Sequence, residues 1–344
     1  AEPELARRGI RLRGFGQSVI ESIAGRKVHS PGIVPGGIAE PMTEETRLEL
    51  LGGLDEAYET ATIALELFVK MLDGFEREVR AFGEFPSYFL ALANDSGTWE
   101  HYDGHLKVID SAGDIAADGV PVSEYRSLVG EASNVDSYLK SPYFKPAVAD
   151  DDPITDGMYR VGPLARVNMA IAMGSPSADA AQAEFKNRAD GIATSSFFFH
   201  YARLIEVLAC TEQMRTLLEH DHVTDAMVRA SGGVNHRRAV GASEAPRGTL
   251  FHEYHVDANG ILDDVNMIIA TGQNNLAMNA TVHQIAKEWI DGPEIPEGIL
   301  NRVEAGIRAF DPCLSCSTHA IGQMPLVVTL VDSAGETVCE RIRG

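Results

Sequence analysis

Cysteine is scarce in this sequence. Only four occur among the 344 residues, at Cys210, Cys313, Cys316 and Cys339. So few cysteines do not make the disulfide framework of a small secreted protein. A chain of this length buries roughly three quarters of its unfolded surface, so its core needs no disulfides. We therefore expect a cytoplasmic protein in a reducing compartment, in which the one close cysteine pair is reserved for chemistry.

Basic residues are also few. Lys and Arg total 29 against 50 Asp and Glu, which gives a net charge of −21. This balance argues against nucleic acid and anionic membrane surfaces as partners, because both attract basic patches. No apolar run reaches the roughly 18 residues that a membrane-spanning helix needs. The N-terminus also lacks the charged and then apolar pattern of a signal peptide.

The spacing of apolar residues predicts several helices. Such residues recur every three or four positions over residues 48–75 and 178–218, and the first run predicts one long helix or two in tandem. Thr43 is the expected N-cap of the first helix, followed by Glu44 and Glu45 where the helix dipole favours acidic groups. Further helices are predicted over residues 282–290 and 299–310.

Short strand-like segments lie between the helices. Residues 86–122 contain several, broken by Asp-Gly pairs that favour turns. Two β-rich runs flank Asp-Ala-Asn-Gly at 257–260, which predicts a hairpin over 248–269. A last strand is expected at 326–331. The sequence has no internal repeat, and it predicts a predominantly helical α+β fold with small β insertions.

The Cys-x-x-Cys pair has several interpretations by itself. Cys313 and Cys316 could ligate one metal ion from a single turn, and Pro312 stiffens the approach. A zinc site would want a second pair, which this sequence lacks. A thioredoxin-like redox pair would open a helix after a strand, unlike this context. Two buried structural thiols are the remaining reading.

The surrounding motif is more specific. Residues 311–319 read Asp-Pro-Cys-x-x-Cys-x-x-His, which resembles the C-terminal metal motif of nickel–iron hydrogenase large subunits. Four further stretches resemble the same family, in family order: Gly-Arg-Lys-Val-His at 25–29 with Pro-Gly-Gly at 35–37, Gly-Pro-Leu-Ala-Arg-Val-Asn at 162–168, Glu-Ala-Pro-Arg-Gly at 244–248, and Ala-Thr-Gly-Gln-Asn-Asn at 270–275. The resemblance extends over residues 14–344 and implies the hydrogenase large-subunit fold.

The resemblance implies an activity and a cofactor. The family splits dihydrogen reversibly into protons and electrons at a nickel–iron centre, whose iron carries carbon monoxide and cyanide. Four cysteine thiolates hold that centre, and Cys313 and Cys316 match the C-terminal two. By position, Cys313 would be a terminal nickel ligand and Cys316 would bridge nickel and iron. Thiolates are soft ligands and suit these metals.

One half of the family's ligand set is missing from the sequence. The N-terminal Arg-x-Cys-Gly-x-Cys motif is absent, so we expect this chain to be an incomplete reading of a longer enzyme and to be inactive by itself. The rival is a metal-free, hydrogenase-like scaffold subunit of an electron-transfer complex. Retention of Arg247 and Asp311 with both cysteines favours the first explanation.

Four residues besides the cysteines have implied roles at the centre. Arg247 would place its guanidinium over the open metal position, although a surface ion pair is the ordinary alternative. Asp311 would orient Arg247, or serve merely as a turn residue. Pro246 and Thr271 would contact the cofactor, with Thr271 donating to a cyanide ligand. An ordinary loop threonine is the alternative for Thr271.

Other residues have smaller expected roles. His29 would face a partner's iron–sulfur cluster in the family, but a lone loop histidine is more often structural. We interpret His200 and Arg203 as packing or surface residues on a helix. Cys210 lies in an apolar run and is interpreted as a small buried hydrophobe.

The resemblance also divides the chain into two parts. Residues 1–319 would form the catalytic region, and residues 320–344, with Cys339, a C-terminal extension that is removed during maturation. An endopeptidase would cut after His319 once nickel-insertion proteins had acted, and His319 would then bind magnesium. Electrons would leave through iron–sulfur clusters in a small subunit, towards a diaphorase-type or other acceptor subunit. The motifs are most similar to the cytosolic group linked to NAD(P), deazaflavin or heterodisulfide reductase.

Overall fold

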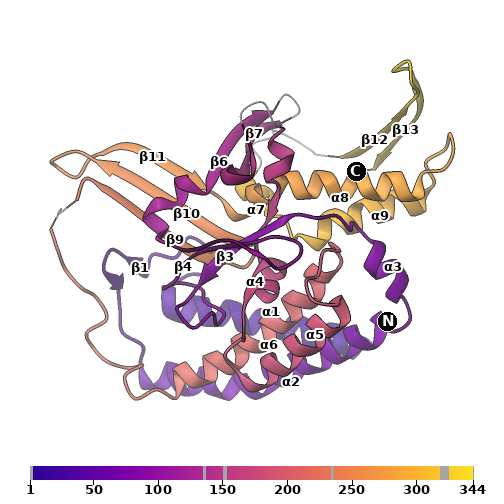
Figure 1. Ribbon diagram of the computed structural model, residues 1–344. Coiled ribbons are helices and arrows are strands. Elements are labelled where there is room, and N and C mark those ends of the chain that lie inside the picture. Colours follow the sequence, from indigo (N-terminus) through magenta and orange to yellow (C-terminus); the bar gives the residue numbers. More distant parts are fainter. Residues whose placement is uncertain (1–2, 135–136, 150–152, 234–235, 318–324, 344) are drawn as a thin grey trace. The chain divides into compact units, whose positions relative to one another are not determined.

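The computed structural model describes residues 3–134, 137–149, 153–233, 236–317 and 325–343 (Figure 1). The chain forms two compact units. The first consists of Ala1–Gly74, Gly174–Ala181 and Leu204–Arg237, and the second of Phe75–Met173, Gln182–Arg203 and Arg238–Gly344.

Helices form the first unit. Its main elements are α1 (Pro3–Ala24), α2 (Glu44–Leu72) and the later part of α6 (Phe198–Leu218), with the short strands β1 (Ile33–Val34) and β2 (Gly37–Ile38) between α1 and α2. Leu50, Leu54 and Leu218 make a buried cluster against Phe15 and Val19 of α1. The N-cap prediction is confirmed, because the Thr43 hydroxyl accepts the backbone N–H of Thr46 at 3.2 Å.

A four-stranded sheet lies in the second unit, after α3 (Glu76–Ala81). Its order is β5 (Ile115–Val120), β4 (His105–Ile109), β3 (Tyr88–Ala93) and β8 (Tyr159–Arg160). β3 and β8 are parallel, and the other pairs are antiparallel. The core built on this sheet contains Leu90, Leu92, Leu106, Val108, Tyr125, Leu128, Val129, Phe144, Tyr159, Val161, Phe251 and Ile268.

Two antiparallel β elements adjoin this core. β6 (Val129–Asn134) pairs with β7 (Ser137–Phe144), and β9 (Arg238–Ala245), β10 (Gly248–Val256) and β11 (Leu262–Ile268) form a sheet with β10 in the middle. The predicted hairpin over 248–269 is confirmed as β10–β11. β9 was not predicted, and it turns directly into β10 through Pro246 and Arg247.

The helix predicted over 178–218 is in fact two helices, α5 (Pro176–Ala189) and α6. Asp190 and Gly191 interrupt it with φ values of 57° and 109°, in the left-handed region that ends helices. α4 (Pro163–Met169) follows β8, and α7 (Ala270–Gln273), α8 (Asn275–Trp289), α9 (Glu297–Ala309) and α10 (Leu314–Ser317) follow β11. Short 3₁₀ helices occur at Val122–Ser127, Lys145–Ala147 and Ile154–Gly157.

The chain closes with β12 (Leu326–Val331) and β13 (Thr337–Arg343), which pair as an antiparallel hairpin. The strand predicted at 326–331 is therefore confirmed, and its partner β13 was not foreseen. The mixed, predominantly helical α+β class is confirmed as well. Among the described residues, the longer helices are all too polar to cross a membrane.

Candidate metal centre

The two cysteines lie on a short loop in the second unit, directly after α9. Asp311 ends this helix with φ at 51°, and its N–H bonds to the carbonyl of Arg308 at 3.0 Å. The chain then turns at Pro312, and the N–H of Cys316 donates to the carbonyl of Cys313 at 3.1 Å. The two Cα atoms are 5.4 Å apart, and the sulfur atoms are joined as a disulfide. One tight turn therefore brings both sulfurs to a single point.

This geometry fits one half of a four-thiolate centre. A metal would bind the reduced pair, so the joined sulfurs occupy the places of two thiolate ligands. Within the described ranges, no cluster of three or more His, Cys, Asp or Glu side chains is placed to hold a metal ion. Cys316 is exposed and Cys313 half-buried, which leaves the pair open to further ligands.

Arg247 reaches this loop from the β9–β10 turn. Its Nη2 lies 3.3 Å from a carboxylate oxygen of Asp311, and its Nε donates to the Asp311 carbonyl oxygen. The side chain of Arg247 is 33% exposed and that of Asp311 45%. A fixed guanidinium therefore lies beside the loop that carries Cys313. The structure brings Arg247 and Asp311 into contact, while their roles at a metal centre stay a prediction.

Thr271 is tied to the same loop. The residue is 5% exposed, and its hydroxyl oxygen accepts the backbone N–H of Cys313 at 3.1 Å. The hydroxyl proton of Thr271 remains available to donate. α7 therefore positions the first cysteine through its main chain, a contact that sequence reasoning did not identify. Pro246 precedes Arg247 at the tip of the β9–β10 turn and is exposed.

A buried ion pair holds the turn that presents Arg247. Nη1 of Arg166 lies 2.7 Å from a carboxylate oxygen of Glu244, and the two side chains are 2% and 0% exposed. Arg166 also donates to the carbonyls of Ala245 and Pro246, at 3.0 Å and 3.3 Å. Because a buried charge requires a partner, this pair fixes the two residues that precede Arg247. Arg166 and Glu244 were named from the sequence only as members of two motifs, and no contact between them was predicted.

The other oxygen of Glu244 is also satisfied. It accepts the N–H of Leu92 on β3 and the hydroxyl of Thr249 on β10, each at 2.8 Å. The buried Gln273 donates to the carbonyl of Thr249 and accepts the hydroxyl of Tyr159. Such a fully bonded buried network restrains a turn to one conformation.

Two glycines let the backbone approach this turn. A Cβ on Gly162 would lie 2.6 Å from the carbonyl oxygen of Arg247, and one on Gly248 would lie 2.2 Å from a methyl of Val161. Both glycines also have positive φ, at 91° and 142°. The segment that enters α4 therefore presses directly on the turn, and only glycine fits there.

The beginning of α6 supports the cysteine loop from another direction. Nη2 of Arg203 donates to the carbonyl of Ala309 at 3.0 Å, and Phe199 packs on Phe310 with ring centroids 4.6 Å apart. Burial, reinforced by the charge of Arg203, lowers the pKa of His200 to about 4, against a raising effect of Asp311. His200 is thus neutral near pH 7. The interpretation of His200 and Arg203 as packing or surface residues did not foresee the contact of Arg203 with Ala309.

Several predicted residues are not part of this arrangement. His29 and Cys210 belong to the first unit, and Cys210 is half-buried. Cys339 lies on β13. His319 lies outside the described residues, so its predicted magnesium site stays a prediction.

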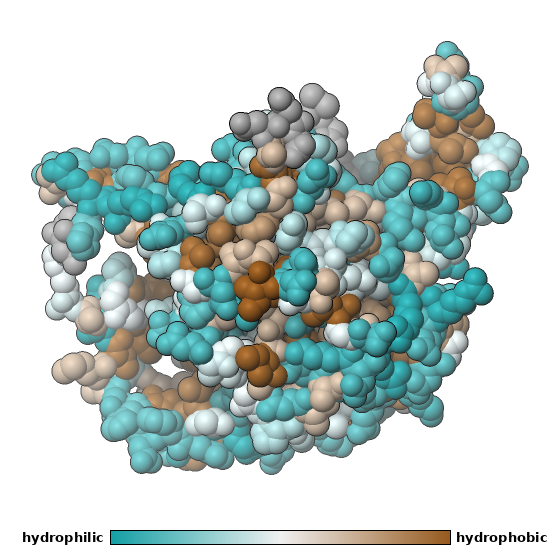
Figure 2. Space-filling model, viewed as in Figure 1, coloured by the Kyte–Doolittle hydropathy of each residue, from teal (hydrophilic) through white to brown (hydrophobic). Residues whose placement is uncertain are grey.

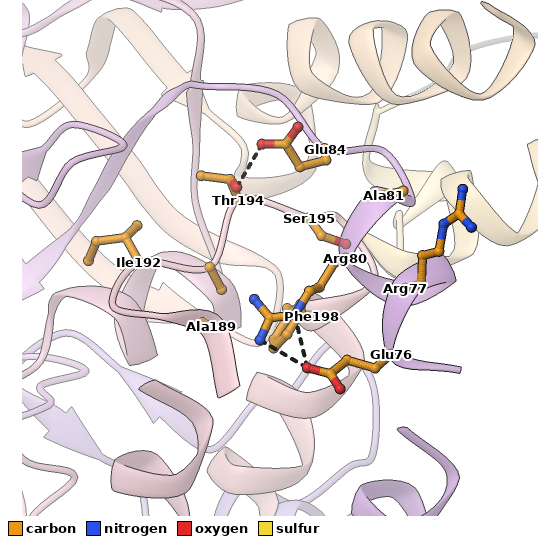
Figure 3. Close-up of a pocket in the computed structure, with 11 residues that line it drawn as sticks. Glu76, Arg77, Arg80, Ala81, Glu84, Ala189, Ile192, Thr194, Ser195 and Phe198 are labelled. Atoms are coloured by element: carbon orange, nitrogen blue, oxygen red, sulfur yellow. Dashed lines mark hydrogen bonds and ion pairs between the residues drawn. The ribbon is translucent and has the colours of Figure 1, made fainter. Parts of the chain in front are cut away.

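A separate pocket of about 780 Å³ occurs in the second unit (Figure 3). Two contacts join residues of its lining: Arg80 pairs with Glu76 at 3.1 Å, and the Thr194 hydroxyl donates to Glu84 at 3.1 Å. The lining residues are Glu76, Arg77, Arg80, Ala81, Glu84, Ala189, Ile192, Ala193, Thr194, Ser195 and Phe198. None of the predicted site residues is among them, so this pocket is not the metal centre.

Comparison with known proteins agrees with the geometry. A family model described as nickel-dependent hydrogenase matches residues 105–319, the stretch that contains Arg166, Arg247 and both cysteines. The chain belongs to the nickel-dependent hydrogenase family. It is 36% identical to the NAD-reducing hydrogenase HoxS subunit beta of Cupriavidus necator, covering 100% of this chain and 71% of that protein.

Two further hydrogenases show the same relation. The matching chain of the F420-non-reducing hydrogenase of Methanothermobacter marburgensis is 36% identical, over 98% of this chain and 70% of its own length. The crystal structure of an NAD⁺-reducing [NiFe]-hydrogenase in the H₂-reduced state superposes with a TM-score of 0.87 at 36% identity, covering 93% of this chain and 70% of that one. This chain is thus a large subunit of the nickel–iron type, an oxidoreductase acting on hydrogen, and it has the expected fold.

Proposed function

We propose that Cys313 and Cys316 hold the C-terminal side of the nickel–iron centre and that Arg247 acts beside it during reversible dihydrogen oxidation. The observation that carries this proposal is the contact of Arg247 with Asp311, two residues before Cys313. When bound, the centre supplies the position at which dihydrogen is split. Cys313 is proposed as a terminal nickel ligand and Cys316 as the bridging ligand, with carbon monoxide and cyanide on the iron.

The role of Arg247 follows from its fixed position. A guanidinium stays protonated and presents several N–H donors in one plane. Held by Asp311 and by the turn at Pro246, it places positive charge and donors next to the reacting position without needing to reorganise. Thr271 is proposed to donate its free hydroxyl proton to a cyanide ligand. Asp311 and Glu244 are positioning residues that act through Arg247.

The ligand test uses the enzyme assembled with the N-terminal cysteine motif and its small subunit. Cys316→Ala should bind less than a tenth of the nickel of the wild type and lose dye-linked hydrogen uptake, because alanine offers no donor to the metals. Cys339→Ala is the matched control and should keep both. A Cys316→Ala enzyme with full nickel and full activity would refute the ligand assignment.

A metal-free scaffold is the second candidate function. Cys313 and Cys316 match two of the family's four thiolates by motif, and we propose that residues 1–344 by themselves cannot complete the centre. The metal-free scaffold function predicts that no nickel is bound, even in the assembled complex. Elemental analysis of the wild-type complex therefore separates the two functions.

Maturation and partners complete the proposal. We propose that residues 1–319 are the catalytic region and that an endopeptidase removes residues 320–344 after nickel insertion, leaving His319 to bind magnesium. Mass spectrometry of enzyme grown with and without nickel tests this order. Active enzyme in which residues 320–344 are still covalently attached would contradict it.

Electrons would pass first to the iron–sulfur clusters of a small subunit, then to an acceptor subunit, in the cytoplasm. One relative is named NAD-reducing, and another is named F420-non-reducing, which gives no acceptor. Assays of the complex with NAD(P), deazaflavin and a heterodisulfide would identify the acceptor. Failure with all three would remove this part of the proposal.

A further inference from the structure

The C-terminal hairpin β12–β13 begins beside α8 and projects away from it in the second unit (Figure 1), and side chains along one of its faces pack against α8, α9 and the segment between these helices. Alternate residues of β12 point to the helices, and those between them are exposed. Leu326, Val328 and Leu330, together with Cys339 of β13, pack against the helix surface. That surface consists of Trp289, Ile290, Ile295, Ile299 and Leu300.

Polar contacts fix the open end of the hairpin. Arg343, at the end of β13, reaches three groups of α9: Glu297 at 3.1 Å, Glu304 at 3.4 Å and the side-chain oxygen of Asn301 at 2.6 Å. The hairpin therefore presents an apolar row and one cation. The helix surface presents the complementary apolar residues and two carboxylates.

The opposite face of the hairpin is exposed. Val327 and Ile342 pair across the strands there and are 48% and 65% exposed. Figure 2 shows hydrophobic residues gathered on this hairpin, at the upper right of the view. The hairpin therefore has one face that contacts the helices and one that does not, so single substitutions can separate folding of the hairpin from its docking.

We infer that the α8–α9 surface is a binding site for a β-hairpin, and that residues 325–343 occupy it as a ligand that needs no covalent attachment. Partial burial of Leu326, Val328 and Leu330 against three buried side chains of the helix surface, together with the Arg343 contacts, supplies the affinity. Cutting the chain before residue 325 would then leave the hairpin in place. Cleavage and uncovering of α8–α9 become two separate events, and the second requires dissociation.

The test uses the full chain with a site-specific protease sequence in place of residues 320–324. After the cut, the fragment should co-elute with the rest of the chain in gel filtration, as detected by mass spectrometry. A fluorescent synthetic peptide of residues 325–344 should exchange into the vacated site, which gives a dissociation constant. A fragment that separates completely in the first gel filtration of the wild type would overturn the inference.

Matched variants assign the affinity to the docked face. Val328→Asp should weaken retention about tenfold or more, because it places a charge in the apolar contact. Val327→Asp makes the same change on the neighbouring, exposed residue and should stay within about twofold of wild type. Equal loss in both would mean that the hairpin unfolds rather than undocks, and would also overturn the inference.

Arg343→Gln should weaken retention by about threefold, and the difference should shrink at high salt, because the ion pairs with Glu297 and Glu304 are partly exposed. Arg341→Gln is the control, since that guanidinium donates to the carbonyl of Glu340 instead. The inference goes beyond the proposed function and does not need it. The cut is made by the added protease, so a chain never processed in the cell gives the same result.

Discussion

The Arg247 turn and the cysteine loop face one another, but the chain holds them very differently. The turn rests on the buried pair of Arg166 and Glu244, on the buried Gln273 and on two close-packed glycines. The loop is held by the Thr271 contact and by Arg247 itself, and Cys316 is exposed. This chain therefore fixes the Arg247 turn through its own buried contacts. If the proposed function holds, the cysteine loop would reach its final geometry only with the metals and the remaining ligands.

The largest expected effect on stability comes from breaking the buried ion pair of Arg166 and Glu244, which holds the Arg247 turn. Glu244→Gln should reduce the free energy of unfolding by about 3–5 kcal/mol, because it leaves the buried charge of Arg166 without its partner. Denaturant unfolding measures the change. The control is Glu44→Gln, which removes an exposed partner of Arg47 and should reduce the free energy of unfolding far less than Glu244→Gln does.

A double variant sharpens this prediction. Arg166→Met with Glu244→Met removes both charges and should cost much less than the sum of the single changes, since the residues act as one unit. Equal costs for Glu244→Gln and Glu44→Gln would mean that the buried pair does not support the turn, and the contrast between the two regions would fail.

Substitutions on the cysteine loop should have smaller effects than those at the buried ion pair. Asp311→Asn removes the carboxylate near Arg247 but keeps the backbone carbonyl that also binds it, and asparagine tolerates the positive φ of this position. We expect hydrogen uptake of the assembled enzyme to fall by about tenfold or less, with normal nickel content. Asp311→Ala should be less stable than Asp311→Asn by about 1 kcal/mol, because alanine is strained there. The reverse order would exclude backbone strain as the reason for Asp311.

The smallest effect is expected at Thr271. Thr271→Val removes the acceptor of the Cys313 N–H and should cost about 1 kcal/mol of stability. Thr271→Ser keeps the hydroxyl and should restore most of it. Hydrogen exchange at the amide of Cys313 is the direct readout, faster in Thr271→Val than in the wild type. Unchanged exchange in both variants would show that this contact does not position the loop.

The sequence predicted the parts of the molecule that local patterns encode. The hairpin β10–β11 followed from its turn residues, and the Cys313 loop and Arg247 followed from motifs. β9 was not predicted, because apolar and polar residues hardly alternate in its segment, Arg238–Ala245. α1 was not predicted, because Gly9, Gly14 and Gly16 lower the helical propensity of its segment.

The support of the site could not be predicted in the same way. Arg166 and Glu244 are 78 residues apart, and their pairing is a product of the tertiary fold. Arg203 and Ala309 are 106 residues apart, so a helix that was interpreted as ordinary packing in fact holds the cysteine loop. The local periodicity of a sequence carries no information on contacts between distant residues. Only the folded chain shows which residues of a motif support the site.

The central claim is that Arg247 is held in place by the chain and acts in the chemistry rather than in metal binding. Arg247→Lys in the assembled enzyme tests it most directly, because lysine keeps the charge and loses the planar fork of donors. We predict a fall in hydrogen uptake of about 100-fold, comparable to losing one preorganised donor. Nickel and iron content and the unfolding midpoint should match the wild type. An Arg247→Lys enzyme with full turnover, or one that loses its metals, would contradict this claim.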